Sequence, residues 1–333
     1  MINEAKSHKG YIIGGIVILL LIVLTVGITI TGNVIRSDKV ELRVNFLIDG
    51  EHAPYYLGLE KGFYAEEGID LQINPGKGSS LAVQLVGTGE ETFGLASSEI
   101  VLKGKTNGIP VTSVAVVNPR SPVTIISLKE KEILDPEDLY GRTLGVNYKS
   151  NTYQQYRALV KTAELDDSKI TEVPGAATLD NLLSGRVDAI LRQTHNEPVT
   201  LISNGYEINE LLFEDHGIHF YGITIIASDE TIRGNPELVR GFIRATEKAW
   251  QYSLENPGEA AEALTKHNPE LDTDITQGQF LKFASLVDTE GMEKGDFGQM
   301  TFEEWDNTQE TLFELGLIEK RVDVNTVFTN KFL

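Results

Sequence analysis

The chain has 333 residues, of which 41% are hydrophobic, so it can bury a sizeable core and form two lobes at roughly 100–200 residues per domain. Its formal net charge of −20 disfavours binding to a phosphate backbone, which requires a basic face, and we expect no nucleic-acid partner. The lack of cysteine excludes disulfides, thiolate metal sites, cysteine nucleophiles and the acylated cysteine of a lipoprotein.

An apolar run, Tyr11 to Thr31, occupies the N-terminal region; as a helix, its about 20 uncharged residues are enough to cross a bilayer. Lys6 and Lys9 precede it and favour a cytoplasmic N-terminus at residues 1–10, with the folded part outside the cell membrane. The alternative is a cleaved signal, which would leave the protein secreted or periplasmic. The run exceeds the usual ~7–15-residue signal core, which favours a retained anchor at residues 11–31.

From residue 40 onward, short β-branched runs alternate with amphipathic stretches, which is typical of an α/β fold with mostly parallel sheets. The first series of strands is predicted at Leu42–Leu47, Asp70–Asn74, Thr92–Leu95 and Pro110–Val117. Helices are predicted between them at Pro54–Lys61, from Ser79 or Ser80 to Gly87, and from Ser98 onward.

A second series of elements follows. Its strands are predicted at Val123–Leu128, Thr143–Val146, Ile170–Val173, Asp188–Leu191 and Glu207–Leu212, and its helices near Thr152–Ala163, Ala177–Ser184 and Pro198–Asn204. The stretches Leu81–Leu95 and Leu179–Leu191 share a helix, glycine and strand pattern, which favours two similarly built lobes. The C-terminal part is predicted as a strand at Tyr221–Ala227 and helices at Pro236–Glu255, Pro257–Lys266, Asp274–Val287 and Phe302–Leu315.

Polar, glycine-rich or aromatic loops follow the predicted strands in both series. Ligands of open α/β sheets lie beyond the carboxyl ends of the strands, so these loops predict a cleft for a small polar molecule. The predicted solute contacts are Asp49, His52, Tyr55, Tyr56, Lys77, Gly78, Ser79, Ser97, Tyr148, Asn151, Arg192, Glu197 and Tyr221.

Among these contacts, we expect Tyr55 or Tyr56 to stack on one face of a ring and Tyr148 on the other. Asp49, Ser79 and Ser97 are expected to hydrogen-bond the edge of that ring. Lys77, Lys149 and Arg192 offer positive charge to an anionic group.

Catalytic and metal-binding alternatives have less support. Asp49 and His52 are compatible with an acid/base pair, but no Gly-x-Ser-x-Gly elbow or other nucleophile accompanies them. His216 and His219 flank a glycine, which disfavours a helical pair of metal ligands. We therefore expect binding without chemistry, and we expect no catalytic residue, metal or cofactor.

Several motifs carry a resemblance to a known family. They are His52-Ala-Pro-Tyr-Tyr56, Lys61-Gly-Phe-Tyr-Ala-Glu-Glu-Gly-Ile-Asp70, Gly76-Lys-Gly-Ser79, Thr92-Phe-Gly-Leu95, Asp138-Leu-Tyr-Gly-Arg-Thr-Leu-Gly-Val146, Leu183-Ser-Gly-Arg-Val-Asp-Ala189 and Asn235-Pro-Glu-Leu-Val239. In this order and spacing the chain resembles the periplasmic binding proteins that include the NMT1/THI5-like proteins and the sulfonate, taurine and nitrate binders.

The resemblance implies the type II binding-protein fold, with two α/β lobes, a ligand cleft and two crossover strands near Val123–Ser127 and Gly222–Ala227. Residues 40–124 and 223–333 would form the first lobe, and residues 125–222 the second. The implied protein is a monomer that delivers a solute to an ABC permease and its ATPase.

Within the family, Asp49-Gly-Glu-His52 and Phe220-Tyr-Gly222 resemble the branch that binds pyrimidine precursors of thiamine, or related heterocycles such as riboflavin. A sulfonate, taurine or nitrate binder is the alternative. The synthases of the family use a cysteine-rich motif, which this chain lacks. An enzyme acting on a pyrimidine-like substrate and a membrane-tethered sensor remain as other classes.

Overall fold

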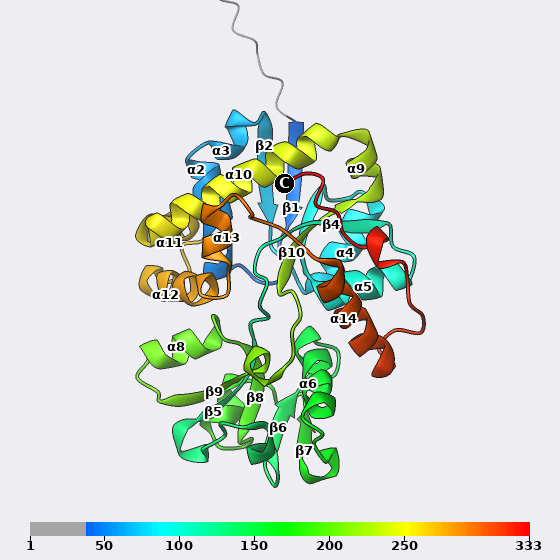
Figure 1. Ribbon diagram of the computed structural model, residues 1–333. Helices are drawn as coiled ribbons and strands as arrows, with labels where there is room; N and C mark the ends of the chain where they lie inside the picture. Colours follow the sequence, from blue (N-terminus) through cyan, green and yellow to red (C-terminus); the bar gives the residue numbers. More distant parts are fainter. Residues whose placement is uncertain (1–37) are drawn as a thin grey trace, which may run out of the picture. The chain divides into compact units, whose positions relative to one another are not determined.

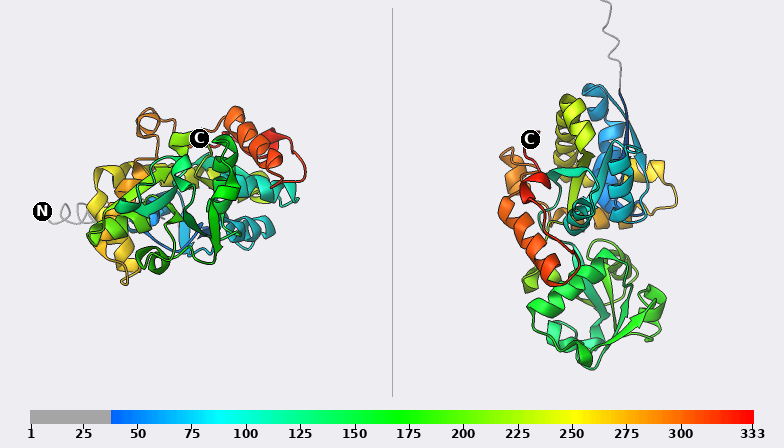
Figure 2. Two further views of the ribbon diagram at one scale, coloured as in Figure 1. Left: turned by 90° about the horizontal axis from the view of Figure 1, so that it is seen from below. Right: turned by 90° about the vertical axis from the view of Figure 1, so that its right-hand side faces the viewer.

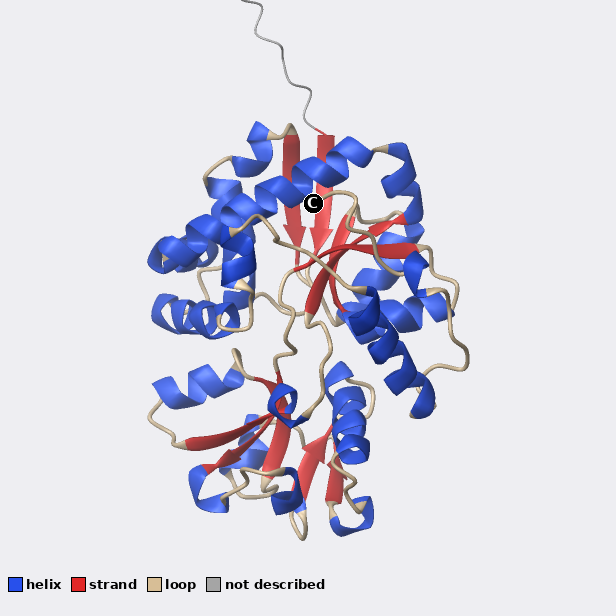
Figure 3. Ribbon diagram, viewed as in Figure 1, coloured by secondary structure: helices blue, strands red, loops and turns tan. Residues whose placement is uncertain are grey.

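The structure, a computed structural model, describes residues 38–333, which contain two β-sheets with helices on their faces (Figure 1; Figure 3). The predicted cytoplasmic segment 1–10 and the predicted membrane segment 11–31 lie outside the described residues. None of the helices within residues 38–333 has the length and apolar character needed to cross a bilayer.

The first sheet has the strand order β2-β1-β3-β10-β4, and we call the part of the molecule built on it the first lobe. Its strands are β1 (Asp38–Arg43), β2 (Ile69–Asn74), β3 (Phe93–Ser97), β4 (Val111–Val116) and β10 (Ile223–Ser228). β1 pairs in parallel with β2 and β3, whereas β10 runs antiparallel between β3 and β4.

The second sheet has the order β7-β6-β8-β5-β9 and forms the second lobe. Its strands are β5 (Val123–Leu128), β6 (Thr143–Val146), β7 (Thr171–Pro174), β8 (Ala189–Gln193) and β9 (Ile208–Leu212). β6 pairs in parallel with β7 and β8, and β5 runs antiparallel between β8 and β9. The sheets are therefore mostly parallel, as predicted, but mixed, because each has one antiparallel strand that enters from the other lobe.

The two connections between the lobes are not the strands expected at Val123–Ser127 and Gly222–Ala227, since β5 and β10 each belong to a single sheet. The chain crosses in the irregular segments 117–122 and 217–222. These segments lie side by side, because Val117 N–H donates to Ile223 O (2.8 Å) and Gly222 N–H donates to Asn118 O (3.0 Å). A Cβ on Gly222 would lie 2.0 Å from Asn118 Nδ2, so only glycine permits this close approach.

Helices of the first lobe cover both faces of its sheet (Figure 3). They are α2 (Ala53–Glu60), α3 (Phe63–Glu66), α4 (Ser79–Thr88), α5 (Ser98–Thr106), α9 (Asp229–Gly234), α10 (Pro236–Glu255), α11 (Pro257–His267), α12 (Thr273–Ala284), α13 (Thr289–Glu293) and α14 (Phe302–Glu314). The helices of the second lobe are α6 (Asn151–Thr162), α7 (Leu179–Leu183) and α8 (Glu197–Ser203).

The longest helix among residues 38–333, α10, lies across the sheet of the first lobe (Figure 1). Asn235 caps its N-terminus by accepting from Leu238 N–H, and Pro236 occupies a first-turn position where its missing N–H is tolerated. Its buried face includes Phe242, whose ring stacks on Phe93 of β3 at 4.1 Å between centroids. This packing anchors the helix to the central strand of the sheet.

The C-terminal part of the chain reaches the second lobe (Figure 2). Glu314 at the end of α14 forms an ion pair with Lys161 of α6. Leu315 packs against the hydrophobic core of the second lobe. The C-terminal segment therefore covers the first lobe and also contacts the second lobe, at a place away from the two connections.

Candidate functional site

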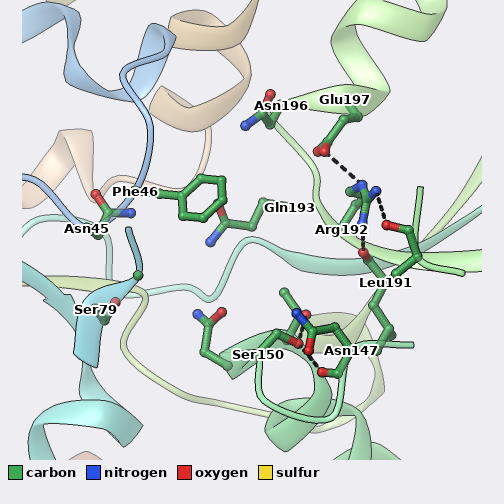
Figure 4. A pocket seen from close by; sticks show the side chains of 14 residues that line it. Asn45, Phe46, Ser79, Asn147, Ser150, Leu191, Arg192, Gln193, Asn196 and Glu197 are labelled. Carbon is green, nitrogen blue, oxygen red and sulfur yellow. Dashed lines mark hydrogen bonds and ion pairs between the residues drawn. The ribbon is translucent and has the colours of Figure 1, made fainter. Parts of the chain in front are cut away.

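A cleft with a volume of about 310 Å³ lies between the lobes (Figure 4). Its walls come from the loops and helix starts that follow β1, β2, β6, β7 and β8, at the carboxyl ends of these strands. The lining residues are Asn45, Phe46, Gly78, Ser79, Asn147, Ser150, Asn151, Thr152, Ala177, Leu191, Arg192, Gln193, Asn196 and Glu197.

Side-chain amides and hydroxyls dominate this lining. An amide carries both N–H donors and an oxygen acceptor, so the remaining donors and lone pairs of these side chains can match a solute edge that carries donors and acceptors together. Asn45 and Asn196 already donate one N–H each, to Glu51 and Asp49. The amides come from both lobes: Asn45 from the first, and Asn147, Asn151, Gln193 and Asn196 from the second.

The two charged residues of the lining neutralise each other. Arg192 Nε lies 2.8 Å from Glu197 Oε1. The other guanidinium nitrogens donate to backbone oxygens of the same lobe, Nη1 to Leu191 O and Nη2 to Ala177 O, each at 2.7 Å. The guanidinium is therefore engaged by its own lobe and offers little free positive charge to a solute.

Phe46 supplies the aromatic surface of the cleft, and its ring extends from the first lobe towards Gln193 of the second (Figure 4). The ring is 47% exposed. The backbone positions it because β1 ends at Arg43 and the following residues pair with the loop after β2: Gly76 N–H donates to Phe46 O and Gly78 N–H to Asn45 O, both at 2.8 Å.

The glycines of the Gly76-Lys-Gly-Ser loop serve this backbone contact. A Cβ on Gly76 would lie 2.0 Å from Val44 O, so the close approach is to the chain after β1 and not to a solute. Gly78 has φ 111°, a conformation that side chains rarely adopt. The turn at Gly78 places Ser79 at the start of α4, where it lines the cleft.

Among the predicted contacts, Gly78, Ser79, Asn151, Arg192 and Glu197 line the cleft. Ser97 lies directly behind Ser79, since its N–H donates to Ser79 Oγ at 3.2 Å. Lys77 and Tyr148 are exposed outside the lining, and so is Lys149. The ring of Tyr148 packs edge-on against Tyr153 at 4.9 Å between centroids.

The expected stacking role of the tyrosines needs correction. Tyr55 is 1% exposed in the core of the first lobe, because α2 is buried along nearly its whole length. Tyr56 packs on the ring of His267. Tyr221 is buried, and its hydroxyl accepts from Thr301 N–H at 2.9 Å. None of the three lines the cleft, and the aromatic wall that the structure does provide is Phe46.

The sequence reasoning missed Asn45 and Phe46. The run Leu42–Leu47 predicts a strand that includes both residues, whereas the structure places them in the loop after β1. A sequence signal for this loop is the turn-forming pair Asp49-Gly50, which follows Phe46 after only two residues; a strand that ended before Asn45 would place both side chains at the sheet edge.

Asp49 and His52 do come together, but as a helix cap. Asp49 Oδ1 accepts from Glu51 N–H (3.1 Å), and Asp49 N–H donates to His52 Nδ1 (3.2 Å). His52 Nε2 lies 2.9 Å from Asn45 Oδ1, and Asn45 Nδ2 donates to Glu51 Oε1 at 2.7 Å. Both residues are buried and lie behind Asn45, so they position a cleft residue instead of lining the cleft.

His195 of the second lobe completes this buried group, with Nε2 3.3 Å from Glu51 Oε2. Burial alone would raise the pKa of Glu51, but the facing rings of His52 and His195 outweigh it and lower the pKa to about 2. Burial would lower the pKa of each histidine, yet Glu51 and Asp49 raise the pKa of both. Asp49, Glu51 and His52 also offer atoms close enough together to hold a metal ion.

Polar contacts join the lobes on both sides of the cleft. On one side, Asn196 Nδ2 donates to Asp49 Oδ2 at 2.7 Å. On the other, Gln155 Nε2 of α6 donates at 3.0 Å to Glu99 Oε1 of α5. Glu99 is fully buried, and this burial raises its pKa to about 7, because the hydrogen bonds to the carboxylate offset only part of the desolvation.

Comparison with known proteins identifies relatives along most of the chain. A profile of the family described as NMT1/THI5 like matches residues 49–260. The riboflavin-binding protein RibY of Chloroflexus aurantiacus is 26% identical over 304 residues, which cover 89% of this chain and 86% of RibY. The formylaminopyrimidine-binding protein of Halalkalibacterium halodurans is 27% identical over 300 residues, which cover 88% of this chain and 90% of that protein.

An enzyme and a solved structure also match. The 4-amino-5-hydroxymethyl-2-methylpyrimidine phosphate synthase of Legionella pneumophila is 26% identical over 321 residues, which cover 89% of this chain and 93% of the synthase. The crystal structure of the periplasmic aliphatic sulphonate binding protein SsuA from Escherichia coli has a TM-score of 0.70 and 14% identity, over 86% of this chain and 91% of SsuA. The two lobes therefore have the periplasmic-binding-protein fold.

Proposed function

Because this chain belongs to the NMT1/THI5-like family, we propose that it is the extracytoplasmic solute-binding subunit of an ABC importer and that it captures an uncharged heterocycle. The proposed solute is a pyrimidine precursor of thiamine or a related heterocycle, and two relatives that are named for binding riboflavin and formylaminopyrimidine support this choice. It binds between the lobes and is handed to a permease that an ATPase drives.

The observation that carries this proposal is the composition of the cleft. Five amide side chains and several hydroxyls surround it, while its one arginine is engaged by Glu197 and two backbone oxygens. A sulfonate or nitrate needs free positive charge or converging N–H donors, because burying an unpaired anion is costly. A heterocycle with alternating donors and acceptors suits the amides, and Phe46 offers a face on which its ring can stack.

Capture without chemistry is further supported by what the chain contains. The sequence has no cysteine, so it cannot carry the cysteine-rich motif of the family's synthases. The imidazoles of His52 and His195 are fully buried and do not line the cleft, and the one carboxylate of the lining, Glu197, is paired with Arg192. We therefore propose that the protein is not an enzyme.

Closure of the lobes would follow from binding. A solute that touches Phe46 and Ser79 on one side and Asn151 and Gln193 on the other stabilises the closed state by its extra contacts. The proposed location is outside the cell membrane, with residues 11–31 as the anchor, or free outside the cytoplasm if that segment is a cleaved signal.

The test is thermal unfolding and calorimetry of the purified protein with pyrimidines, riboflavin, sulfonates, taurine and nitrate. A heterocycle that binds tightly should stabilise the protein by about 2.7 kcal/mol at a hundredfold excess over its Kd. Stabilisation by a sulfonate alone would contradict the proposed solute class. Consumption of any of these compounds during the assay would contradict capture and favour the enzyme class.

A further inference from the structure

Beside the cleft, three ligand-type side chains meet in a buried group that the proposed capture of solute does not use. Asp49 and Glu51 come from the first lobe and His195 from the second. Asp49 is 6% exposed, Glu51 3% and His195 0%. The group therefore exists only where the two lobes contact each other.

Part of this group has no hydrogen-bond partner among residues 38–333. Glu51 Oε2 and both ring nitrogens of His195 make no hydrogen bond of normal geometry, although Nε2 and Oε2 lie within ion-pair distance of each other. Leaving such atoms without a hydrogen bond in a buried site is destabilising, and more so for a charged group. His195 Nε2 and Glu51 Oε2 face each other from opposite lobes at 3.3 Å, so an ion that both atoms bind would satisfy both.

The spacing suits a metal ion. Zn²⁺ bonds to imidazole nitrogen and carboxylate oxygen are about 2.0–2.2 Å long, so two ligands of a tetrahedral ion lie roughly 3.3–3.6 Å apart. Glu51 Oε2 and His195 Nε2 meet this distance, and Asp49 Oδ2 lies 3.9 Å from the same nitrogen. Ligand atoms of Asp49, Glu51 and His52 also lie within 4.8 Å of one another, so His52 borders the same position.

Neighbouring side chains hold the two carboxylates in place, as outer partners do at metal sites. Asn45 donates to Glu51 Oε1 and leaves Oε2 directed at His195. Asn196 donates to Asp49 Oδ2 at 2.7 Å. His52 is not assigned as a ligand, because Asp49 N–H and Asn45 Oδ1 already engage its two nitrogens.

We propose that Asp49, Glu51 and His195 bind one divalent transition-metal ion of the Zn²⁺ type, which joins the two lobes beside the solute cleft. Two carboxylates and a neutral imidazole balance the charge of such an ion. Solvent or a neighbouring oxygen would supply the fourth ligand. Because the ligands come from both lobes, ion and solute each favour the closed state, and each raises the affinity for the other.

The experiment is titration of the full chain, stripped with a chelator, with Zn²⁺ in a calorimeter and with Co²⁺ in a visible spectrometer. We expect one equivalent of either ion, with the intense visible bands of tetrahedral Co²⁺. His195→Gln and Glu51→Gln should each weaken uptake at least tenfold. The matched control is His219→Gln, which removes an exposed histidine that pairs with Glu214, and it should bind like the parent.

Unfolding curves without metal show which variants fold. If a variant does not fold, the Co²⁺ titration of the parent protein still tests the proposal. Absence of a tetrahedral Co²⁺ spectrum in the parent would overturn the proposal, and the buried group would then be an ion pair between protonated His195 and Glu51. Equal uptake by the parent and His195→Gln would also overturn it, since the ion would then bind elsewhere. Solute binding measured in parallel separates this result from a failure of the proposed capture function.

Discussion

Each lobe contains one antiparallel strand that enters from the other lobe, β10 in the first lobe and β5 in the second. In both sheets this strand lies between the third strand and the outermost one. The two lobes nevertheless present different chemistry to the cleft. The first contributes the ring of Phe46 and carries the buried carboxylates of Asp49 and Glu51 behind it. The second contributes most of the amides and the Arg192–Glu197 pair. The shared strand order positions loops, and the loops decide the chemistry.

The lobes also differ in how they are covered. The first carries the long C-terminal helices and a core that runs from the sheet through α2, α10 and α12, with Trp250 fully buried. The second has shorter helices and smaller cores. This difference indicates that the first lobe is the more stable scaffold, and the predictions below test how far the two lobes act separately.

The largest effect is expected from emptying each core in turn. Phe242→Ala in the first lobe and Phe213→Ala in the second each remove a fully buried ring, which should cost about 3–5 kcal/mol of unfolding free energy. Urea unfolding followed by circular dichroism measures both. If the lobes unfold together, each variant shows one transition at a lower midpoint. A second transition in Phe213→Ala alone would show that the second lobe unfolds by itself.

A smaller effect concerns Glu99, which joins the lobes through Gln155. Its pKa of about 7 lies above the ordinary value of 4.5, so the native protein retains a proton that the unfolded chain releases between these values. Stability from this group is complete below pH 4.5 and is lost as the pH rises through 7, a change of about 3 kcal/mol. Glu99→Gln keeps the side chain neutral and should remove this loss.

The measurement is the unfolding free energy at pH 5 and pH 8 for the parent, for Glu99→Gln and for Glu130→Gln, a control that alters an exposed carboxyl. Glu99→Gln should stabilise the protein relative to the parent at pH 8 and much less at pH 5. The same gain at both pH values would mean that the amide improves packing and that the carboxyl does not titrate in this range.

The next prediction concerns the aromatic wall of the first lobe. Phe46→Ala should weaken binding of a heterocyclic solute by about 1.5–3 kcal/mol, since the ring loses its stacking surface. Leu47→Ala is the matched control, because Leu47 is adjacent and exposed but does not line the cleft. Calorimetry should show an affinity near that of the parent for Leu47→Ala. Equal losses in the two variants would mean that the loop backbone, and not the ring, contacts the solute.

The sequence predicts the regular elements well where the signals are local. The strand Val123–Leu128 and the helix Pro236–Glu255 have the predicted bounds, because a β-branched run and an asparagine–proline start are sufficient signals. The first strand was placed too late, at Leu42–Leu47 instead of Asp38–Arg43, because its extent is set by pairing with Ile69–Asn74. Because of this shift, Phe46 falls in the predicted strand and not in the loop that lines the cleft.

The site was harder to predict because its residues meet only through tertiary contacts. The loops at the strand ends were predicted, but not which side chains turn inward. Tyr55 and Tyr56 follow a strand, yet packing of α2 against α10 and α11 buries them. Likewise, no local sequence pattern predicts the contact between His195 and Glu51, because it depends on how the two lobes pack against each other.

The smallest effect is expected at the edge of the lobe contact, where Lys282 Nζ of α12 lies 3.1 Å from Glu210 Oε1 of β9. Lys282 is 41% exposed, so solvent screens the pair, and Lys282→Ala should cost only about 0.2–1 kcal/mol of unfolding free energy. Its effect on solute affinity should be less than about fivefold and should vanish in high salt. Lys129→Ala removes a comparable exposed pair within the second lobe, with Glu207, and should leave solute affinity unchanged. A salt-dependent loss of affinity in Lys282→Ala alone would show that this exposed pair contributes to closure, whereas no difference between the two variants would leave closure to the buried contacts of Asp49 and Glu99.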